Sequence, residues 1–432
     1  MRAFRFVHAA DLHLDSPFRG LVKLPESLRE RLRESTFQAL DRLVQLAVRE
    51  RADFIVISGD VYDIKDRSLR AQLRFCQALE TLAGHQIPAF VIHGNHDPMK
   101  DGYAAKLRYP EGTRVFGCEK VESHVVMDAE GKALCRVSGI SFGQAVVTEN
   151  LTPGFRRWDD GLYHIGLLHT NVDGDPQHDN YAPCSLKDLN GRGVDYWALG
   201  HVHTRQIVQE RPWVVYPGNP QGRHIRETGA RGCYLVDVTA GGETTVQFHA
   251  LDEVRWQEQS VSIAGLTTEQ ELKETLEEAV EAAREVSEGR PALLRVTLTG
   301  RGELHPVLQR AGVKTDLAAL LWEAEKHSQR NAVVWIESIH DQTGALVDRG
   351  HLAAQPGFLG DLLRLAEEAG MTSEQLDSFA TEAFAVMAGQ PMLASLLQGM
   401  GTEELAAWLQ EAEELAMEAL SPELKAESGW TG

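Results

Sequence analysis

The 432-residue sequence contains little cysteine, a deficit of basic side chains and no long hydrophobic stretch. Its five cysteines are odd in number and widely spaced, with no CxxC pair, so a disulfide framework is not expected and a cysteine-rich zinc site is excluded. No apolar run approaches the roughly 20 residues that cross a bilayer, so no membrane association is expected. The first residues lack the apolar segment of a secretory signal, and we therefore expect a cytoplasmic protein.

The shortage of basic charge is uneven along the chain. In total, 43 Lys and Arg oppose 63 Asp and Glu, a formal net charge of −20. Taken alone, this value argues against a nucleic-acid partner, because phosphate backbones bind basic surfaces. Residues 260–432 carry 29 acidic and 12 basic side chains, a net of −17, which leaves −3 for residues 1–259. The charge therefore disfavours DNA on the C-terminal part and does not exclude it from the N-terminal part.

The N-terminal part alternates strand and helix patterns. Apolar runs at 53–58 and 88–93, each followed by glycine, alternate with helical patterns at about 27–51 and 69–83. Strand–helix–strand units of this length indicate parallel crossovers. From about residue 114 the sequence is rich in strand patterns. We therefore expect an α/β fold with helices outside a large mixed sheet, folded into two layers.

Two further parts follow in the sequence. The sequence pattern of residues 256–345 predicts a small α+β module, and that of residues 346–432 predicts an acidic, helical region. We therefore predict three domains, at 1–255, 256–345 and 346–432. An amphipathic pattern at 403–420 predicts a helix whose apolar stripe either packs on the protein itself or docks a partner.

Candidate metal ligands cluster in five short segments that follow predicted strands. The segments are Asp11-Leu-His13, Gly59-Asp60-Val-Tyr-Asp63, Gly94-Asn95-His96-Asp97, His169 and Gly200-His201-Val-His203. Oxygen and imidazole ligands without sulfur favour Mn²⁺, Fe or Zn²⁺ at a site that is not a structural zinc. Alternate side chains just past a strand point the same way, so both ends of DxH or HxH can reach one metal centre. The glycines allow the sharp turns that bring backbone and ligands together.

The ordered set DxH, GDxxD, GNHD, H and GHxH resembles the calcineurin-type dinuclear metallophosphoesterases. Within that superfamily, AADLHLDSPF near the start, LLHTNVDG at 167–174 and YPGNPQGRHIRETGARGC at 216–233 are similar to the bacterial YhaO/SbcD-type DNA repair nucleases, and most to the YhaO branch. The resemblance covers residues 1 to about 255 strongly. It implies a four-layer α/β/β/α sandwich with a small α+β capping domain and a helical C-terminal region.

The resemblance also implies roles for these side chains. One metal ion would be held by Asp11, His13, Asp60 and His203, and the other by Asp60, Asn95, His169 and His201, with Asp60 bridging. The cofactors would be two divalent metal ions, with Mn²⁺ preferred and Fe, Zn²⁺ or Mg²⁺ as alternatives. Two such ions can clamp a phosphodiester and activate water at neutral pH.

His96 is the expected catalytic histidine, because it follows a ligand and its ring can lie over the metals. A histidine that assists a leaving oxygen needs its other ring nitrogen oriented by a partner. Asp63 is the preferred partner and Asp97 the alternative. Several nucleases of the family carry histidine at the position of Asp63, whereas phosphatases carry aspartate, so this position does not separate the two substrate classes.

Basic residues near these motifs are candidate contacts for substrate phosphates. The candidates are Arg19, Arg223, His224 and Arg226, the last three in a segment that resembles the family's substrate-side loop. Further arginines at 19–33, and at 67, 70 and 74, either follow a DNA backbone or simply face solvent.

Three functional hypotheses follow. The first is a Mn²⁺-dependent DNA phosphodiesterase, an exonuclease or endonuclease in DNA repair, for which the resemblance implies an SMC-like ABC ATPase partner that docks near the C-terminus. The second is a phosphatase or small-molecule phosphodiesterase, which should enclose the metals where a nuclease leaves an open groove. The third is a non-catalytic scaffold, which would be expected to have lost ligands. A homodimer is compatible with the sequence, and strand preference and polarity stay open.

Overall fold

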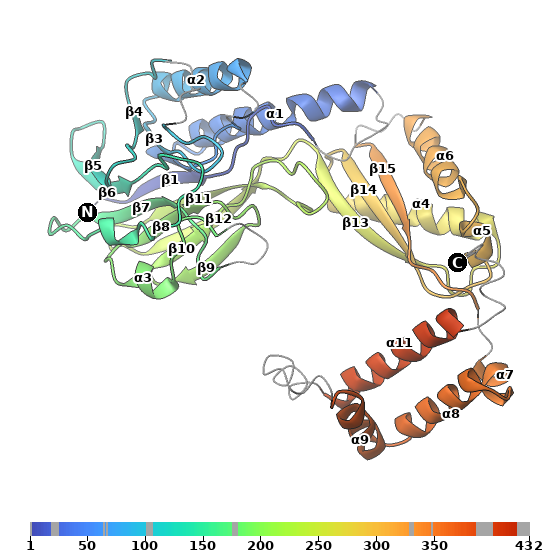
Figure 1. Ribbon diagram of the computed structural model, residues 1–432. Coiled ribbons are helices and arrows are strands. Elements are labelled where there is room, and N and C mark those ends of the chain that lie inside the picture. The colour runs from blue at the N-terminus through green and yellow to red at the C-terminus, as the bar shows by residue number, and fades with distance from the viewer. Residues whose placement is uncertain are drawn as a thin grey trace. The chain divides into compact units, whose positions relative to one another are not determined.

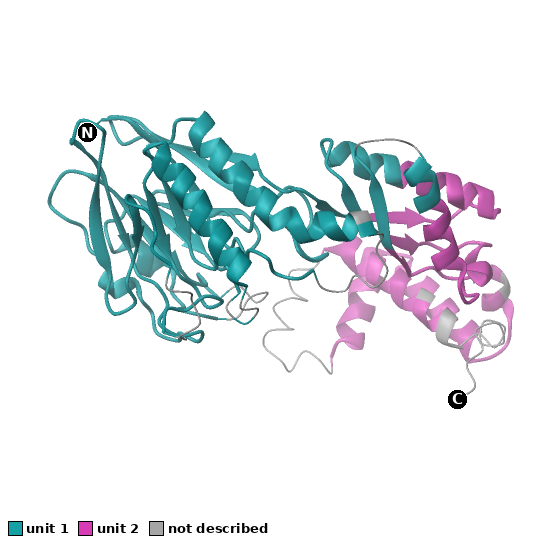
Figure 2. Ribbon diagram, turned by 90° about the horizontal axis from the view of Figure 1, so that it is seen from above, with its two compact units in different colours: residues 1–258, 280–295, 322–337 teal, residues 259–279, 296–321, 338–432 magenta. Residues whose placement is uncertain are grey.

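The computed structural model describes residues 2–18, 26–63, 65, 68–100, 107–174, 180–327, 332–346, 349–385 and 401–420. The chain divides into two compact units, which Figure 2 shows in different colours. The first unit comprises residues 1–258, 280–295 and 322–337, and the second comprises residues 259–279, 296–321 and 338–432. The domain boundaries expected at 255 and 345 stay a prediction.

The first of two six-stranded sheets contains the N-terminal strand (Figure 1). Its strands are β1 (Phe4–Ala9), β2 (Phe54–Ser58), β3 (Ala89–Ile92), β4 (Thr113–Val115), β11 (Gly232–Val238) and β12 (Thr244–Ala250). They lie in the order β12-β11-β1-β2-β3-β4. The pairs from β1 to β4 are parallel, whereas β11 is antiparallel to both of its neighbours.

The second sheet is also mixed. Its strands are β5 (Glu122–Met127), β6 (Ala133–Gly139), β7 (Tyr163–His169), β8 (Tyr196–Gly200), β9 (Gln206–Glu210) and β10 (Trp213–Tyr216). They lie in the order β5-β6-β7-β8-β10-β9, with a parallel centre and antiparallel edge strands.

The main core lies between these two sheets. Phe6 of β1 stacks on Phe54 of β2 with ring centroids 5.2 Å apart, and its ring meets Tyr196 of β8 edge-on at 5.2 Å. The outer face of the first sheet packs against two long helices, and that of the second against a short helix, a 3-10 turn and loops. These elements are α1 (Glu26–Arg49), α2 (Leu69–Gly84), α3 (Leu186–Asn190) and the turn Thr152–Gly154. The four-layer prediction is confirmed.

A three-stranded sheet and a group of helices complete the described chain. The sheet has the order β13-β14-β15, with strands β13 (Arg255–Ser262), β14 (Ala292–Thr299) and β15 (Val334–Asp341), and its helices are α4 (Glu269–Val286), α5 (His305–Leu308) and α6 (Val313–His327). The C-terminal helices are α7 (Arg349–Ala354), α8 (Phe358–Gly370), α9 (Ser373–Ala383) and α11 (Thr402–Leu420). Among the described residues, no helix has the length and hydrophobicity that a membrane crossing requires.

The amphipathic helix expected at 403–420 corresponds to α11. Met417 of this helix is buried with Leu352 and Leu363 of α7 and α8, so part of α11 packs on the protein itself. Trp408 and Leu415 of the predicted stripe remain 42% and 61% exposed. The structure thus uses one edge of the helix for packing and leaves another edge accessible.

Candidate metal centre

The candidate ligands lie at the carboxyl ends of strands from both sheets. Asp11 and His13 follow β1, Asp60 follows β2, Asn95 follows β3, His169 ends β7, and His201 and His203 follow β8. Parallel pairing places these ends side by side, and His169 pairs directly with Gly200. Ligands at the carboxyl ends of strands are the usual location of sites in α/β folds.

Three glycines allow the two sheets to approach closely at this edge. A Cβ on Gly200 would lie 1.9 Å from the carbonyl oxygen of Ser58. A Cβ on Gly94 would lie 2.3 Å from Oδ1 of Asp60, and one on Gly59 would lie 2.5 Å from Nδ1 of His169. Any side chain at these positions would push candidate ligands apart, which is the role expected for the glycines of the motifs.

Four candidate ligands have a left-handed backbone, a conformation that favours glycine. Their φ angles are 52° for Asp11, 41° for His13, 51° for Asp60 and 99° for His201. Each such conformation costs about 1–3 kcal/mol, and such residues cluster at functional sites. Hydrogen bonds across the centre hold them in place. The Asp11 amide donates to the carbonyl of Gly59 at 3.0 Å, and the His201 amide donates to Oδ1 of Asp11 at 3.0 Å.

The donor atoms converge in three overlapping groups, within each of which they lie less than 4.8 Å apart. The groups are Asp11 with His13 and His203, His13 with Asp60 and His96, and Asp11 with Asp60 and His169. Asp11 and Asp60 are completely buried, and each belongs to two groups. Burying two carboxylates without nearby positive charge is costly. This buried set of His and Asp donors therefore fits divalent metal ions.

Three imidazoles are held through Nδ1, which leaves Nε2 facing the centre. The contacts are His13 Nδ1 to Asp63 Oδ1 at 3.1 Å, His169 Nδ1 to the Ser58 carbonyl at 3.0 Å and His203 Nδ1 to Glu227 Oε1 at 2.7 Å. Nε2 of His13 and Nε2 of His203 lie only 3.2 Å apart. A ring nitrogen that donates to a fixed acceptor leaves the other nitrogen's lone pair free for a metal.

The second candidate ligand set also gathers around His169. Asn95 Oδ1 lies 2.9 Å from Nε2 of His169, and Asp60 Oδ2 lies 3.4 Å from the same nitrogen. Although burial lowers the pKa of His169, the Asp60 carboxylate raises it to about 9. His201 is not among the three groups formed by the described residues, but its ring contacts that of His169, with centroids 5.3 Å apart.

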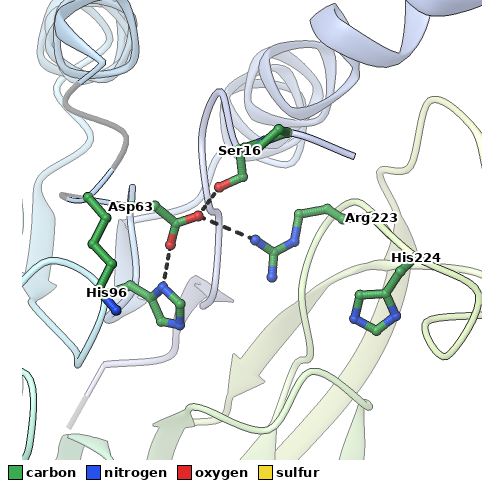
Figure 3. Close-up of a pocket in the computed structure, with 7 residues that line it drawn as sticks. Ser16, Asp63, His96, Arg223 and His224 are labelled. Atoms are coloured by element: carbon green, nitrogen blue, oxygen red, sulfur yellow. Dashed lines mark hydrogen bonds and ion pairs between the residues drawn. The ribbon is translucent and has the colours of Figure 1, made fainter. Parts of the chain in front are cut away.

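His96 lies on the accessible side of the centre, with a side chain that is 41% exposed. Its Nδ1 contacts Oδ1 of Asp63 (Figure 3). The same oxygen contacts His13. Ser16 donates to Oδ2 of Asp63, and the Arg223 guanidinium lies 3.6 Å from that oxygen. Burial lowers the pKa of His96, but its hydrogen bond to Asp63 and the charge of Asp60 raise it above its ordinary value.

Asp97 occupies a different position from Asp63. Its carboxylate accepts hydrogen bonds from the amides of Val61 at 2.8 Å and Gly94 at 2.7 Å, and it lies 2.9 Å from Nδ1 of His93. It therefore closes the turn that carries Asn95 and His96. Of the two partners expected for His96, Asp63 makes the contact within the described residues.

A cavity of about 240 Å³ adjoins the centre (Figure 3). It is lined by Ser16, Pro17, Asp63, Lys65, His96, Arg223 and His224. Two of the expected phosphate contacts, Arg223 and His224, therefore lie beside His96. Arg226 is exposed and does not line the cavity, whereas Arg19 lies outside the described residues.

Three of the other arginines considered as a DNA track make ion pairs with residues distant in sequence. The pairs are Arg31 with Glu253, Arg70 with Glu34 and Arg74 with Asp41. Arg70 and Arg74 also lie over the Phe37 ring, which joins α2 to α1. Position 67 is outside the described residues. These contacts favour a structural role for Arg31, Arg70 and Arg74.

Two buried side chains at the centre lie outside the predicted motifs. Glu227 is 3% exposed and contacts the ligand candidate His203, and Arg231 is buried and donates to the carbonyl oxygen of His203. Burial raises the pKa of Glu227, but the hydrogen bond from His203 holds it well below its usual range. The sequence does carry a signal for Glu227. A ligating histidine such as His203 needs an acceptor for its other ring nitrogen, and Glu227 is an acidic residue in the same segment as Arg223.

The fold and the donor set define a metal-dependent phosphoesterase. A family model described as calcineurin-like phosphoesterase matches residues 4–205, and one described as metallophosphoesterase YhaO, middle domain, matches residues 256–344. The chain belongs to the calcineurin-like metallophosphoesterases, which confirms the resemblance seen in its motifs.

Individual relatives differ in how much of the chain they match. The uncharacterized metallophosphoesterase YhaO of Bacillus subtilis (strain 168) is 37% identical over 326 residues, which are 75% of this chain and 79% of that protein. The DNA double-strand break repair protein Mre11 of Aeropyrum pernix is 28% identical over 254 residues, 54% of this chain and 57% of that protein. The crystal structure of a dimetal phosphatase from Danio rerio matches with a TM-score of 0.36 and 13% identity, over 57% of this chain and 96% of that chain.

Proposed function

We propose that this metallophosphoesterase is a DNA phosphodiesterase, an exonuclease or endonuclease that acts in DNA repair. The observation that carries the hydrolytic part of the proposal is the shared carboxylate of Asp63, which joins the candidate ligand His13 to His96 beside a cationic cavity. The half-exposed His96 ring is accessible to a polymeric substrate. The similarity to Mre11, a DNA double-strand break repair protein, supports DNA as that substrate.

Seven side chains would hold two divalent ions, for which we propose Mn²⁺. One ion would be bound by Asp11, His13, Asp60 and His203, and the other by Asp60, Asn95, His169 and His201. When bound, such ions supply positive charge to a phosphoryl oxygen and activate water as the nucleophile. Asp60 is the proposed shared ligand, since its carboxylate lies near His13 and His169.

His96 would protonate the leaving oxygen of the phosphodiester. Its Nδ1 is held by Asp63, so Nε2 is the nitrogen available to substrate in the cavity. The negative charge of Asp63 stabilises the protonated imidazole that a general acid needs. Asp97 would position His96 indirectly by closing its turn.

Arg223 and His224 would contact substrate phosphate oxygens from the opposite side of the cavity. The Arg223 Nε atom is buried without a hydrogen-bond partner among the described residues. Its other guanidinium nitrogens lie 3.6 Å from Asp63 and 3.9 Å from Glu227, so the charged group is held at the cavity, where a guanidinium suits an anionic oxygen. Exposed Arg226 and, beyond the described residues, Arg19 would add weaker contacts to the DNA backbone.

A small phosphoester is the second candidate substrate. The volume of about 240 Å³ is compatible with it, because a cavity of this size accommodates a small phosphoester group. A non-catalytic scaffold is disfavoured, since five of the seven expected ligands, together with His96, lie in groups close enough to hold a metal ion.

The C-terminal helices would dock a partner, for which we propose an SMC-like ABC ATPase. The exposed Trp408 and Leu415 of α11 supply an apolar contact, and the acidic surroundings disfavour DNA there. Truncation after Gly401 should abolish co-purification of the ATPase and preserve metal-dependent hydrolysis. An unchanged pull-down would exclude α11 as the docking element.

A homodimer is a further proposal, which sedimentation at several concentrations would test.

The deciding experiment compares substrates under the same conditions. Linear duplex DNA, single-stranded DNA and bis(p-nitrophenyl) phosphate should be incubated with the protein and Mn²⁺, with an EDTA control. We expect DNA hydrolysis that Asp60→Ala and His96→Ala abolish and that His85→Ala, a change of an exposed histidine at the end of α2, preserves. Turnover of the small ester without any DNA cleavage would favour the second candidate substrate. Full activity of His96→Ala would refute the proposed mechanism.

A further inference from the structure

Glu227 is a buried carboxylate that serves two parts of the centre at once. Its Oε1 accepts a hydrogen bond from Nδ1 of His203 at 2.7 Å and lies 3.2 Å from Nε2 of His224. Its Oε2 accepts a hydrogen bond from the amide of Arg223 at 2.6 Å. One oxygen therefore holds a candidate metal ligand, and the other holds the segment that lines the cavity.

The segment around Glu227 is folded tightly onto this carboxylate. The Glu227 amide donates to the carbonyl of His224 at 2.9 Å, which closes a turn. A Cβ on Gly222 would lie only 2.6 Å from the Glu227 carbonyl, so the chain can approach itself here because residue 222 is glycine. The position of Arg223 and His224 in the cavity thus depends on where the Glu227 side chain is anchored.

We propose that Glu227 is a positioning residue that couples metal binding at His203 to the placement of Arg223 and His224. Glu227 accepts a hydrogen bond from Nδ1 of His203, so the ring proton stays on Nδ1 and the lone pair on Nε2 is available to a metal ion. This Nε2 atom faces Nε2 of His13. The same carboxylate fixes the substrate-side turn through the Arg223 amide. The inference rests on the ligand role proposed above for His203.

The chemical need for this carboxylate follows from the arrangement of two imidazoles. The Nε2 atoms of His13 and His203 lie 3.2 Å apart, so a proton on either one would occupy the space between them. Asp63 accepts from His13 as Glu227 does from His203, and both nitrogens can then face a cation. Loss of such an acceptor behind a ligating histidine costs about 10–100-fold in metal affinity.

The test is a calorimetric titration of the metal-free protein with Mn²⁺ alone. We expect Glu227→Gln to weaken one of the two Mn²⁺ sites by about 10-fold and Glu227→Ala by up to about 100-fold, with the other site unchanged. Glu253→Gln is the matched control, because Glu253 is also buried and ion-paired but its partners are Arg31 and Arg42. It should leave both affinities at the wild-type value. Melting in EDTA measures the general cost of each change.

A second measurement addresses the substrate-side turn. With bis(p-nitrophenyl) phosphate at saturating Mn²⁺, Glu227→Gln should raise KM several-fold, because Arg223 and His224 lose their anchor. Wild-type Mn²⁺ affinity at both sites in Glu227→Gln and Glu227→Ala would overturn the proposal. Parallel loss of both sites, together with a lower melting temperature in EDTA, would also overturn it in favour of a purely structural role. The titration needs no DNA, so absence of nuclease activity would refute only the proposed substrate.

Discussion

Gly200 provides the sharpest test of how the two sheets form the centre. A methyl group at this position would lie 1.9 Å from the Ser58 carbonyl oxygen and 2.9 Å from Nδ1 of His169, whereas ordinary contacts begin near 3.4 Å. The ends of β2 and β8 would have to separate by more than an ångström. That movement would also break the hydrogen bond of 3.0 Å from His169 to Ser58.

The expected cost of Gly200→Ala combines two effects. Overpacking of a close contact costs about 1–3 kcal/mol, and the lost hydrogen bond adds about 0.5–1.5 kcal/mol. We therefore expect a loss of about 2–4 kcal/mol in the free energy of unfolding, measured by urea denaturation in EDTA. Mn²⁺ affinity should fall as well, because His169 would lose its orientation.

Gly84→Ala is the matched control for this change. Gly84 ends α2, and apart from its chain neighbours and the backbone of its own helix no atom lies within 4 Å of the position its Cβ would occupy. Alanine should therefore stabilise the protein by up to about 1 kcal/mol and leave Mn²⁺ binding unchanged. A Gly200→Ala variant with wild-type stability and wild-type Mn²⁺ affinity would refute the idea that close approach of the sheets builds the centre.

Three further changes test other parts of the site and fold. Asp63→Asn should lower kcat by about 10²–10⁴-fold, because the charge that supports protonated His96 is lost. The assay uses the substrate that the wild type hydrolyses. An unchanged kcat would exclude Asp63 as the partner of His96. Removal of divalent ions with EDTA should lower the melting temperature. Mn²⁺ at about 100 times its Kd should raise the free energy of unfolding by about 2.7 kcal/mol per site. An unchanged melting temperature on metal addition would contradict a buried site. Burial raises the pKa of Asp160, but hydrogen bonds led by that from Arg136 lower it to about 2. This stabilisation is present above the unfolded pKa and is lost as the pH falls toward 2, so Asp160→Asn should cost about 1 kcal/mol at pH 7 and progressively less in denaturation curves below pH 4.

The buried strands were the most predictable part of the fold. The apolar runs expected at 53–58 and 88–93 correspond to β2 and β3 to within one residue at each end, because each is an apolar run in a core. The strands β4, β5, β9 and β12 were not predicted individually. They are edge strands with half-exposed faces, so their sequences carry a weak apolar signal.

The gathering of the candidate ligands was predictable for a similar reason. Parallel strands bring their carboxyl ends to one edge of each sheet, so DxH after β1 lies beside Asp60 after β2, and HxH after β8 lies beside His169 of β7. Packing of the two sheets against each other then brings these ligand sets together. The partners of these ligands were harder to predict. Glu227 is 24 residues from His203 in sequence and reaches it through a turn whose shape depends on Gly222 and on contacts with β13. One such contact is the hydrogen bond of 3.1 Å from the Trp256 indole to the Gly222 carbonyl.

The ion pairs change what the near-neutral charge of residues 1–259 implies about DNA binding. Several of the arginines that made residues 1–259 nearly neutral form ion pairs with carboxylates, as in Arg31 with Glu253 and Arg74 with Asp41. At the cavity, we expect attraction of a polyanion to come from Lys65, from Arg223 and from the cations that the buried carboxylates would hold. Because those cations are part of the attraction, DNA affinity should depend on Mn²⁺ as well as on salt concentration. A protein that bound DNA equally well in EDTA would instead be using a surface away from the centre.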